Sequence, residues 1–277
     1  MGLRINTNVE AMNAHRNLSN TALALSRSMQ RLSSGLRINS AADDAAGLGI
    51  SERMRSQISG VDQASRNAQD GISLVQTAEG ALSEFHSILH RIRDLAVQYN
   101  NGVYDPQSKL AITSEVAQLS SELTRMLSAA TFNGIPLLSG NSATAPIMAT
   151  LQIGANNNEI VTLAAVAANQ AMGNAVFNFA NATVATTYVS LAAIDAVIDT
   201  ISAKRSSLGA IQNRLEHTIN FLGVYQENLS GAESRIRDVD MASEMTNFTK
   251  LQILQQSGTA MLSQANMSSQ SILSLMK

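Results

Sequence analysis

The chain has 277 residues and a formal net charge of −2, and its residues are 45% hydrophobic but only 4% aromatic. This charge argues against nucleic acid as a main partner, because no basic excess is available to neutralise phosphates. The chain contains no cysteine, which excludes disulfides and thiolate metal sites. A composition rich in Ala, Leu, Ser, Asn and Gln with few prolines predicts a helical chain.

The N-terminal stretch MGLRINTNVEAMNAHRNL has neither the apolar core nor the small-residue cleavage site of a secretory signal peptide. No segment reaches about 18 consecutive apolar residues, so we expect neither a membrane span nor a membrane partner. The protein is therefore expected in the cytoplasm, or outside the cell by a route that needs no cleaved signal.

The first predicted helix carries apolar residues at alternating spacings of three and four. This stripe consists of Leu18, Ala22, Leu25, Met29, Leu32 and Leu36. Asn39-Ser40 interrupts the pattern, and Asp43 and Asp44 follow. Adjacent carboxylates on a helix point about 100° apart, so they do not converge on one substrate atom. We therefore expect both aspartates to cap a helix at a joint that also includes Asn39 and Gly47.

The second predicted helix runs from about Ala45 to Gln98, and a third begins after Asp105-Pro106. Both carry the same apolar spacing, and Asn133–Pro136 ends the third. His86 and His90 lie four apart, a spacing that can place two imidazoles on one metal ion. No glutamate lies between them and no third ligand is evident, so we favour a solvated pair over a zinc site. No nucleophile motif is present either, and we expect no enzyme and no cofactor.

From about Gly140 to Ser190 the helical pattern stops. The runs 148–153 and 160–163 flank a Gly/Asn-rich turn, which predicts a β-hairpin with a longer loop. The remaining segment, 169–190, is small and polar and is expected to be irregular.

Helical spacing returns towards the C-terminus, and its last stripe includes Leu251, Leu254, Met261, Ile272 and Leu275. The charged run 233–240 is interpreted either as a solvated helix face or as ion pairs that lock helices or subunits. We predict a mainly α fold, in which the two halves of the chain pair as a long antiparallel helical bundle or coiled coil with a small β-hairpin inserted. The terminal stripes have little to pack against in one copy, so we expect a second copy to cover them.

Several long stretches resemble bacterial flagellin, the subunit of the flagellar filament. The N-terminal ones are LRINTNVEAMNAHRNL, RLSSGLRINSAADDAAGLGISERMRSQI, NAQDGISLVQTAEGAL and TFNGIPLLSG. The C-terminal ones are AKRSSLGAIQNRLEHTINFL, ENLSGAESRIRDVDMASEM and QILQQSGTAMLSQANMSSQSILSLMK. Only the middle, about 140–190, is unmatched in detail, so the chain is similar to a short flagellin with little or no outer variable domain.

The resemblance implies an inner coiled-coil domain, an outer helical domain and a variable segment. Their expected residues are 1–40 with 236–277, 41–140 with 190–235, and 141–189, respectively. The inner assembly seam implied here consists of Leu18, Leu25, Met29, Leu32, Leu251, Leu254, Met261, Ile272 and Leu275. The joint at Asn39–Gly47 then serves structure and not catalysis.

The resemblance also implies partners. These are other copies of the chain, a secretion chaperone, the filament cap and hook-junction proteins, with export through the flagellar type III channel to the extracellular filament. A host Toll-like receptor is a further expected partner, with Arg91, Leu95 and Glu115 as contacts. The alternative is a hook–filament junction protein, which shares flagellin-like ends but does not polymerise at length.

Overall fold

The computed structural model describes residues 7–138, 147–164, 166, 176, 179 and 189–275, with residues 147–148 and 268–275 described by their backbone alone. The chain divides into two compact units. Unit 1 comprises residues 1–56 and 228–277, and unit 2 comprises residues 57–227. None of the helices in the described part of the chain is both long and apolar enough to cross a membrane.

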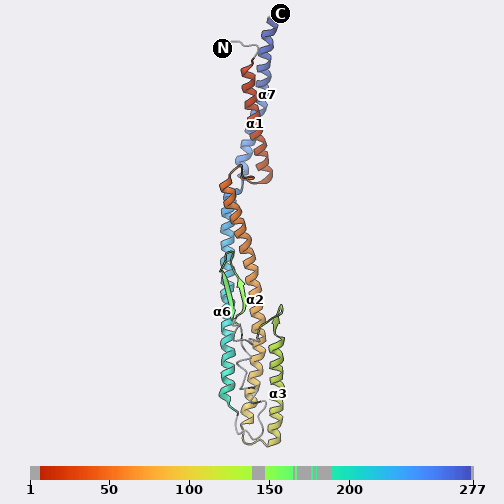
Figure 1. Cartoon of the computed structure of the whole chain (residues 1–277), viewed down its shortest axis with the longest axis vertical. Helices are drawn as coiled ribbons and strands as arrows, with labels where there is room; N and C mark the ends of the chain where they lie inside the picture. Colours follow the sequence, from red (N-terminus) through yellow and green to blue (C-terminus); the bar gives the residue numbers. More distant parts are fainter. Residues whose placement is uncertain are drawn as a thin grey trace. The chain divides into compact units, whose positions relative to one another are not determined.

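Unit 1 contains a pair of antiparallel helices, α1 (Val9–Ser34) and α7 (Met241–Leu275), which lie side by side (Figure 1). Asn8 caps α1 by accepting a hydrogen bond from the Ala11 N–H, and its amide donates to the Ala265 carbonyl at 2.9 Å. Gly35 ends α1 in the left-handed region at φ 73°, where a residue without a Cβ is unstrained. The first residues of α1 therefore meet the later part of α7.

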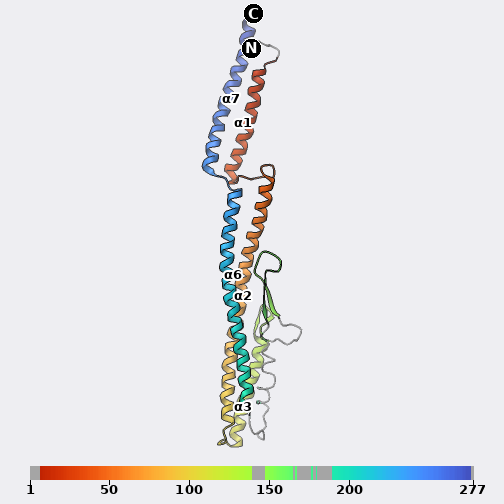
Figure 2. The same cartoon turned by 90° about the vertical axis from the view of Figure 1, so that its left-hand side faces the viewer.

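Unit 2 is built on three helices: α2 (Ala45–Tyr99), α3 (Pro106–Ala129) and α6 (Leu191–Arg237). Helices α2 and α6 begin or end in unit 1, and Figure 2 shows them running alongside α3. Asp105 caps α3 by accepting from the Ser108 N–H, and Pro106 occupies the first turn, where its missing N–H costs nothing. The expected boundary of the second helix, Ala45 to Gln98, is within one residue of the observed one.

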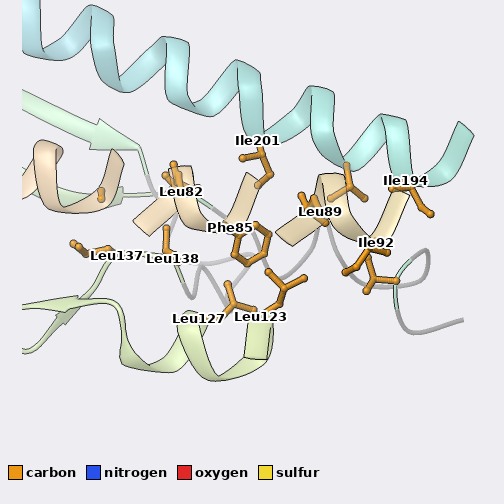
Figure 3. Close-up of a cluster of buried hydrophobic side chains, with 14 of the residues drawn as sticks. Leu82, Phe85, Leu89, Ile92, Leu123, Leu127, Leu137, Leu138, Ile194 and Ile201 are labelled. Carbon is orange, nitrogen blue, oxygen red and sulfur yellow. The ribbon is translucent and has the colours of Figure 1, made fainter. Parts of the chain in front are cut away.

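The hydrophobic core of unit 2 lies where these three helices meet. Phe85 and Leu89 of α2 point between Leu123 of α3 and Ile201 of α6 (Figure 3), and Phe85, Leu89, Leu123 and Ile201 have no exposed surface. Each of these side chains contributes about 1.5–3 kcal/mol by leaving water. Because α3 and α6 both pack against α2, the apolar stripe of α2 is buried along this part of the helix.

In the sequence, two antiparallel hairpins separate α3 from α6. β3 (Ile147–Gln152) pairs with β4 (Ile160–Ala164), as the sequence predicts, and Leu151 of β3 packs where Gly71 of α2 leaves room. A shorter hairpin, β1 (Thr131–Phe132) with β2 (Ile135–Pro136), was not predicted. Its turn places Asn133 and Gly134 at φ 47° and 78°, the type I′ arrangement that Asn-Gly favours.

The predicted fold class is confirmed: the chain is mainly α, its N- and C-terminal helices pack together, and small antiparallel hairpins interrupt them. The expected irregular segment 169–190 lies almost entirely outside the described residues. The expected domain boundaries at 40/41 and 235/236 stay a prediction. The first lies in the break between α1 and α2, and the second lies within α6, two residues before its end, whereas the compact units divide at 56/57 and 227/228.

Candidate functional site

A groove of about 600 Å³ opens between α1 and α7 of unit 1. Leu18 lines one wall, Leu254 and Met261 line the other, and Gly258 lies between them. A Cβ on Gly258 would stand 3.2 Å from Leu18 Cδ1, so the missing side chain lets the two helices approach closely. The groove therefore combines residues of both predicted terminal stripes.

The predicted seam is only partly covered in one copy of the chain. Leu18, Leu25, Leu32 and Leu251 are half-buried, whereas Met29, Leu254 and Met261 are exposed. The side chains of Ile272 and Leu275 lie outside the described residues. Among the described side chains of α1 and α7, none that is apolar is fully buried. The large exposed apolar residues of these two helices are Val9, Met12, Leu23, Met29, Met241, Met245, Ile253, Leu254, Met261 and Met267.

A polar contact that the apolar pattern does not predict fixes the register of α1 against α7. Ser28, which is 2% exposed, donates a hydrogen bond to Glu244 Oε1 at 2.5 Å. The other carboxylate oxygen lies 3.8 Å from Arg31 Nη1. Glu244 is in the first turn of α7, where the helix dipole favours a negative charge. The apolar stripe of α1 gives no signal for this contact, because Ser28 lies beside the stripe residue Met29 and not on the stripe.

The predicted joint residues lie together at the start of α2. Asp44 Oδ1 accepts from the Gly47 N–H at 2.9 Å, which caps the helix. Asp43 Oδ2 accepts from the backbone N–H groups of Asn39 and Ser40 and from the Ser40 hydroxyl, and these bonds lower the pKa of Asp43. Both carboxylates are thus occupied by backbone groups. A Cβ on Gly47 would lie 2.7 Å from the Cδ1 of buried Ile38.

The two interhelical breaks of unit 1 pair with each other through the backbone. Leu36 forms an antiparallel bridge with Asp238, and the Val239 N–H donates to the Gly35 carbonyl at 3.0 Å. Arg237, whose side chain is 11% exposed, donates to Glu52 Oε1 at 2.6 Å. For Arg237, the ion-pair interpretation of the charged run 233–240 therefore applies within the chain.

The expected receptor-contact residues do not share one exposed surface in unit 2. Arg91 of α2 donates two hydrogen bonds to Glu115 Oε1 of α3, at 2.9 and 2.7 Å, and both side chains are exposed. Leu95 is 2% exposed and belongs to the core between the helices. Its side chain is therefore not available to a partner in this structure, and only Arg91 and Glu115 form a surface feature.

His86 and His90 on α2 approach each other directly, with their Nε2 atoms 2.8 Å apart. His86 is partly buried, and this burial lowers its pKa, helped by the neighbouring His90 and Arg205. Within the described residues, no group of three or more His, Cys, Asp or Glu side chains could hold a metal ion. The two rings thus interact directly, and His90 remains exposed to solvent.

Each half of the chain matches the model of a known protein family. Residues 5–143 match the model of the bacterial flagellin N-terminal helical region, and residues 191–276 match that of the C-terminal helical region. The chain is 49% identical over 274 residues to the flagellin of Halalkalibacterium halodurans, with 99% of each chain covered. It is 46% identical over 288 residues to the flagellar filament 33 kDa core protein of Treponema phagedenis, again with 99% of each covered.

Two solved structures are also similar. The crystal structure of Bacillus cereus flagellin has a TM-score of 0.50 and 28% identity, and the match covers 56% of this chain and 88% of that one. A putative flagellar hook-associated protein from Vibrio parahaemolyticus has a TM-score of 0.56 with 14% identity, and 71% and 100% of the two chains are covered. At that identity the second likeness concerns the fold alone.

Proposed function

Because the chain belongs to the bacterial flagellin family, we propose that it polymerises into the flagellar filament through the uncovered apolar faces of α1 and α7. The observation that carries this proposal is the absence of any fully buried apolar side chain among the described residues of these two helices. A helix pair that has no buried hydrophobic core of its own gains stability by burying its apolar faces against further copies.

The free energy gained by covering these apolar faces is small enough that assembly should need a seed. The large exposed apolar residues on α1 and α7 are each about half exposed, so covering one contributes on the order of 1 kcal/mol. Their sum is comparable to the cost of about 4–15 kcal/mol for fixing one protein against another. Two copies alone therefore associate weakly, whereas a subunit that joins a filament end meets several neighbours at once.

Seeded polymerisation of the purified full chain, followed by electron microscopy, tests the proposal. Long tubes of uniform diameter that grow from short filament fragments are the expected result. Protein that stays monomeric beside active seeds would contradict it and favour the hook–filament junction protein, which carries similar ends but does not extend.

We propose further that the chain leaves the cell through the flagellar type III channel and assembles beyond the hook-junction proteins and beneath the cap. The exposed apolar face of α7 supports a secretion chaperone that covers this helix before export, because such a face promotes aggregation. Co-expression with a flagellar secretion chaperone should yield a one-to-one complex. Loss of that complex in Met261→Asp, with binding retained in Met261→Leu, is expected.

A Toll-like receptor contact at Arg91 and Glu115 is also proposed. The exposed ion pair between α2 and α3 supports it, since Arg is enriched where proteins bind tightly. The test compares receptor activation by Arg91→Ala with activation by Arg125→Ala, because Arg125 forms a similar exposed pair with Glu122 on α3. We expect reduced activation only for Arg91→Ala. Equal activation by both variants would remove this contact from the proposal.

A further inference from the structure

His86 and His90 present two ring nitrogens to one point on the surface of α2. The residues are one helical turn apart, their ring centroids are 4.4 Å apart, and the ring planes cross at 83°. The Nε2 atoms lie 2.8 Å apart, so one ring donates its N–H to the lone pair of the other. His90 is exposed, so solvent and small ions reach this point.

The separation of the two nitrogens matches the spacing of neighbouring ligands on a metal ion. Two nitrogens bound at about 2.0 Å and at right angles to each other lie about 2.8 Å apart, as in square or octahedral coordination. Tetrahedral coordination at the same bond length requires about 3.3 Å. The observed 2.8 Å is the length of the hydrogen bond between the two rings, and it already brings the two nitrogens close to the spacing that square coordination requires.

We propose that His86 and His90 form a two-histidine site for a divalent transition-metal ion, with Cu²⁺ as the preferred occupant. Imidazole is a favoured ligand of Cu²⁺, which heads the affinity order of the first-row divalent ions and takes square-planar nitrogen coordination. Water completes the coordination sphere, because the described residues offer no third His, Cys, Asp or Glu ligand beside the pair. The chain contains no cysteine, so no thiol competes with the two imidazoles for the ion.

The surroundings of the pair permit a bound cation. Arg205 of α6 is the positive group near His86, and it pairs with Glu79 of α2 at 3.6 Å, which offsets its charge. The shared proton between the two rings moves from Nε2 to Nδ1 of the ring that carries it when the metal binds. For His86 this exchange breaks no hydrogen bond of Nδ1, because that buried atom has no hydrogen-bond partner among the described residues.

The site stands apart from the proposed polymerisation, which depends on α1 and α7. It also differs from a structural or catalytic zinc centre, because two protein ligands hold an ion less tightly than three or four. The sequence offers no third ligand, which argues against a zinc centre. The same lack limits the affinity of the proposed site but does not prevent two histidines from binding one ion.

Titration of the full-length monomer with Cu²⁺, followed by electron paramagnetic resonance, tests the proposal. We expect one ion per chain with nitrogen couplings from two imidazoles. His90→Gln should weaken binding by at least about tenfold, since even outer ligands of metal sites contribute that much. His90 is exposed, so this variant should fold normally; His86→Gln should behave alike. The doubly substituted control, His15→Gln with His217→Gln, should bind as the wild type does.

Two results would overturn the site. One is a His90→Gln variant with unchanged affinity and unchanged nitrogen couplings, and the other is a loss of binding in the His15→Gln and His217→Gln control. A rise in the melting temperature on adding Cu²⁺, present in the wild type and absent in His90→Gln, is a second expected readout. Wild-type filaments that form while either contrary result holds would leave the proposed polymerisation intact and remove only the metal site.

Discussion

The substitution Met261→Asp separates assembly from folding. The Met261 side chain lines the groove between α1 and α7 and is 65% exposed in one copy of the chain. A carboxylate at such a position remains in water, so the free energy of unfolding of the monomer should change by no more than about 0.5 kcal/mol. In a polymer that covers the groove, the same charge would be buried without a partner.

The cost in the polymer follows from desolvation. Burying an unpaired carboxylate costs several kcal/mol even after the protein relaxes. A penalty of about 4 kcal/mol for each added subunit raises the critical concentration for polymerisation by about a thousandfold. We therefore expect Met261→Asp to unfold like the wild type and to form no filaments. Leu254→Asp should also prevent polymerisation, with a somewhat larger cost to the monomer because Leu254 is 46% exposed.

The assay combines thermal unfolding by circular dichroism with sedimentation of seeded polymerisation reactions. Met261→Leu is the matched control, since it retains an apolar side chain of similar volume and should polymerise. Normal filaments from both aspartate variants would refute the placement of the seam on this face. A large loss of monomer stability in Met261→Asp would instead show that the face is already buried within one copy.

Three further predictions concern the stability of the monomer. Gly47→Ala should lower the free energy of unfolding by about 1–3 kcal/mol, because its Cβ would meet Ile38, whereas Gly49→Ala meets nothing within 4 Å and should be neutral or stabilising in chemical denaturation. Phe85→Ala, which empties a fully buried site, should cost about 3–5 kcal/mol by the same measurement, and a cost below about 1 kcal/mol would contradict the core described here. Because the folded chain holds the pKa of His86 below 6.5, the unfolded chain binds more protons there. Stability should therefore fall as the pH drops below about 6.5, and His86→Gln should flatten this dependence in melting curves across that range.

Apolar spacing and capping residues predict the helices well, because in this chain the two signals agree. The start of α2 follows an aspartate that accepts from the Gly47 N–H, and its end precedes an Asn-Asn-Gly sequence. The β3–β4 hairpin is likewise marked by two alternating runs around a Gly/Asn loop. The β1–β2 hairpin was missed because strands of two residues carry no periodic signal, even though Asn133-Gly134 is a strong turn sequence.

The burial of Leu95 was not foreseen for a different reason. A spacing of three and four residues selects the narrow stripe that one partner helix covers. In this part of α2 the stripe runs through Leu89, Ile92 and Ala96, so Leu95 lies beside it. α2 packs against both α3 and α6, so its buried face is wider than the stripe and includes Leu95. The number of helices that surround a given helix is a property of the tertiary fold, and a local pattern does not contain it. The contact of Ser28 with Glu244 was missed because it joins residues 216 positions apart.

Amide hydrogen exchange, compared between the monomer and seeded polymers, tests the central claim most directly. We expect rapid exchange along α1 and α7 in the monomer and strong protection of the same amides in the polymer. The amides of α2, α3 and α6 around the buried core should be protected in both states. Equal protection of α1 and α7 in monomer and polymer would contradict assembly through these two helices.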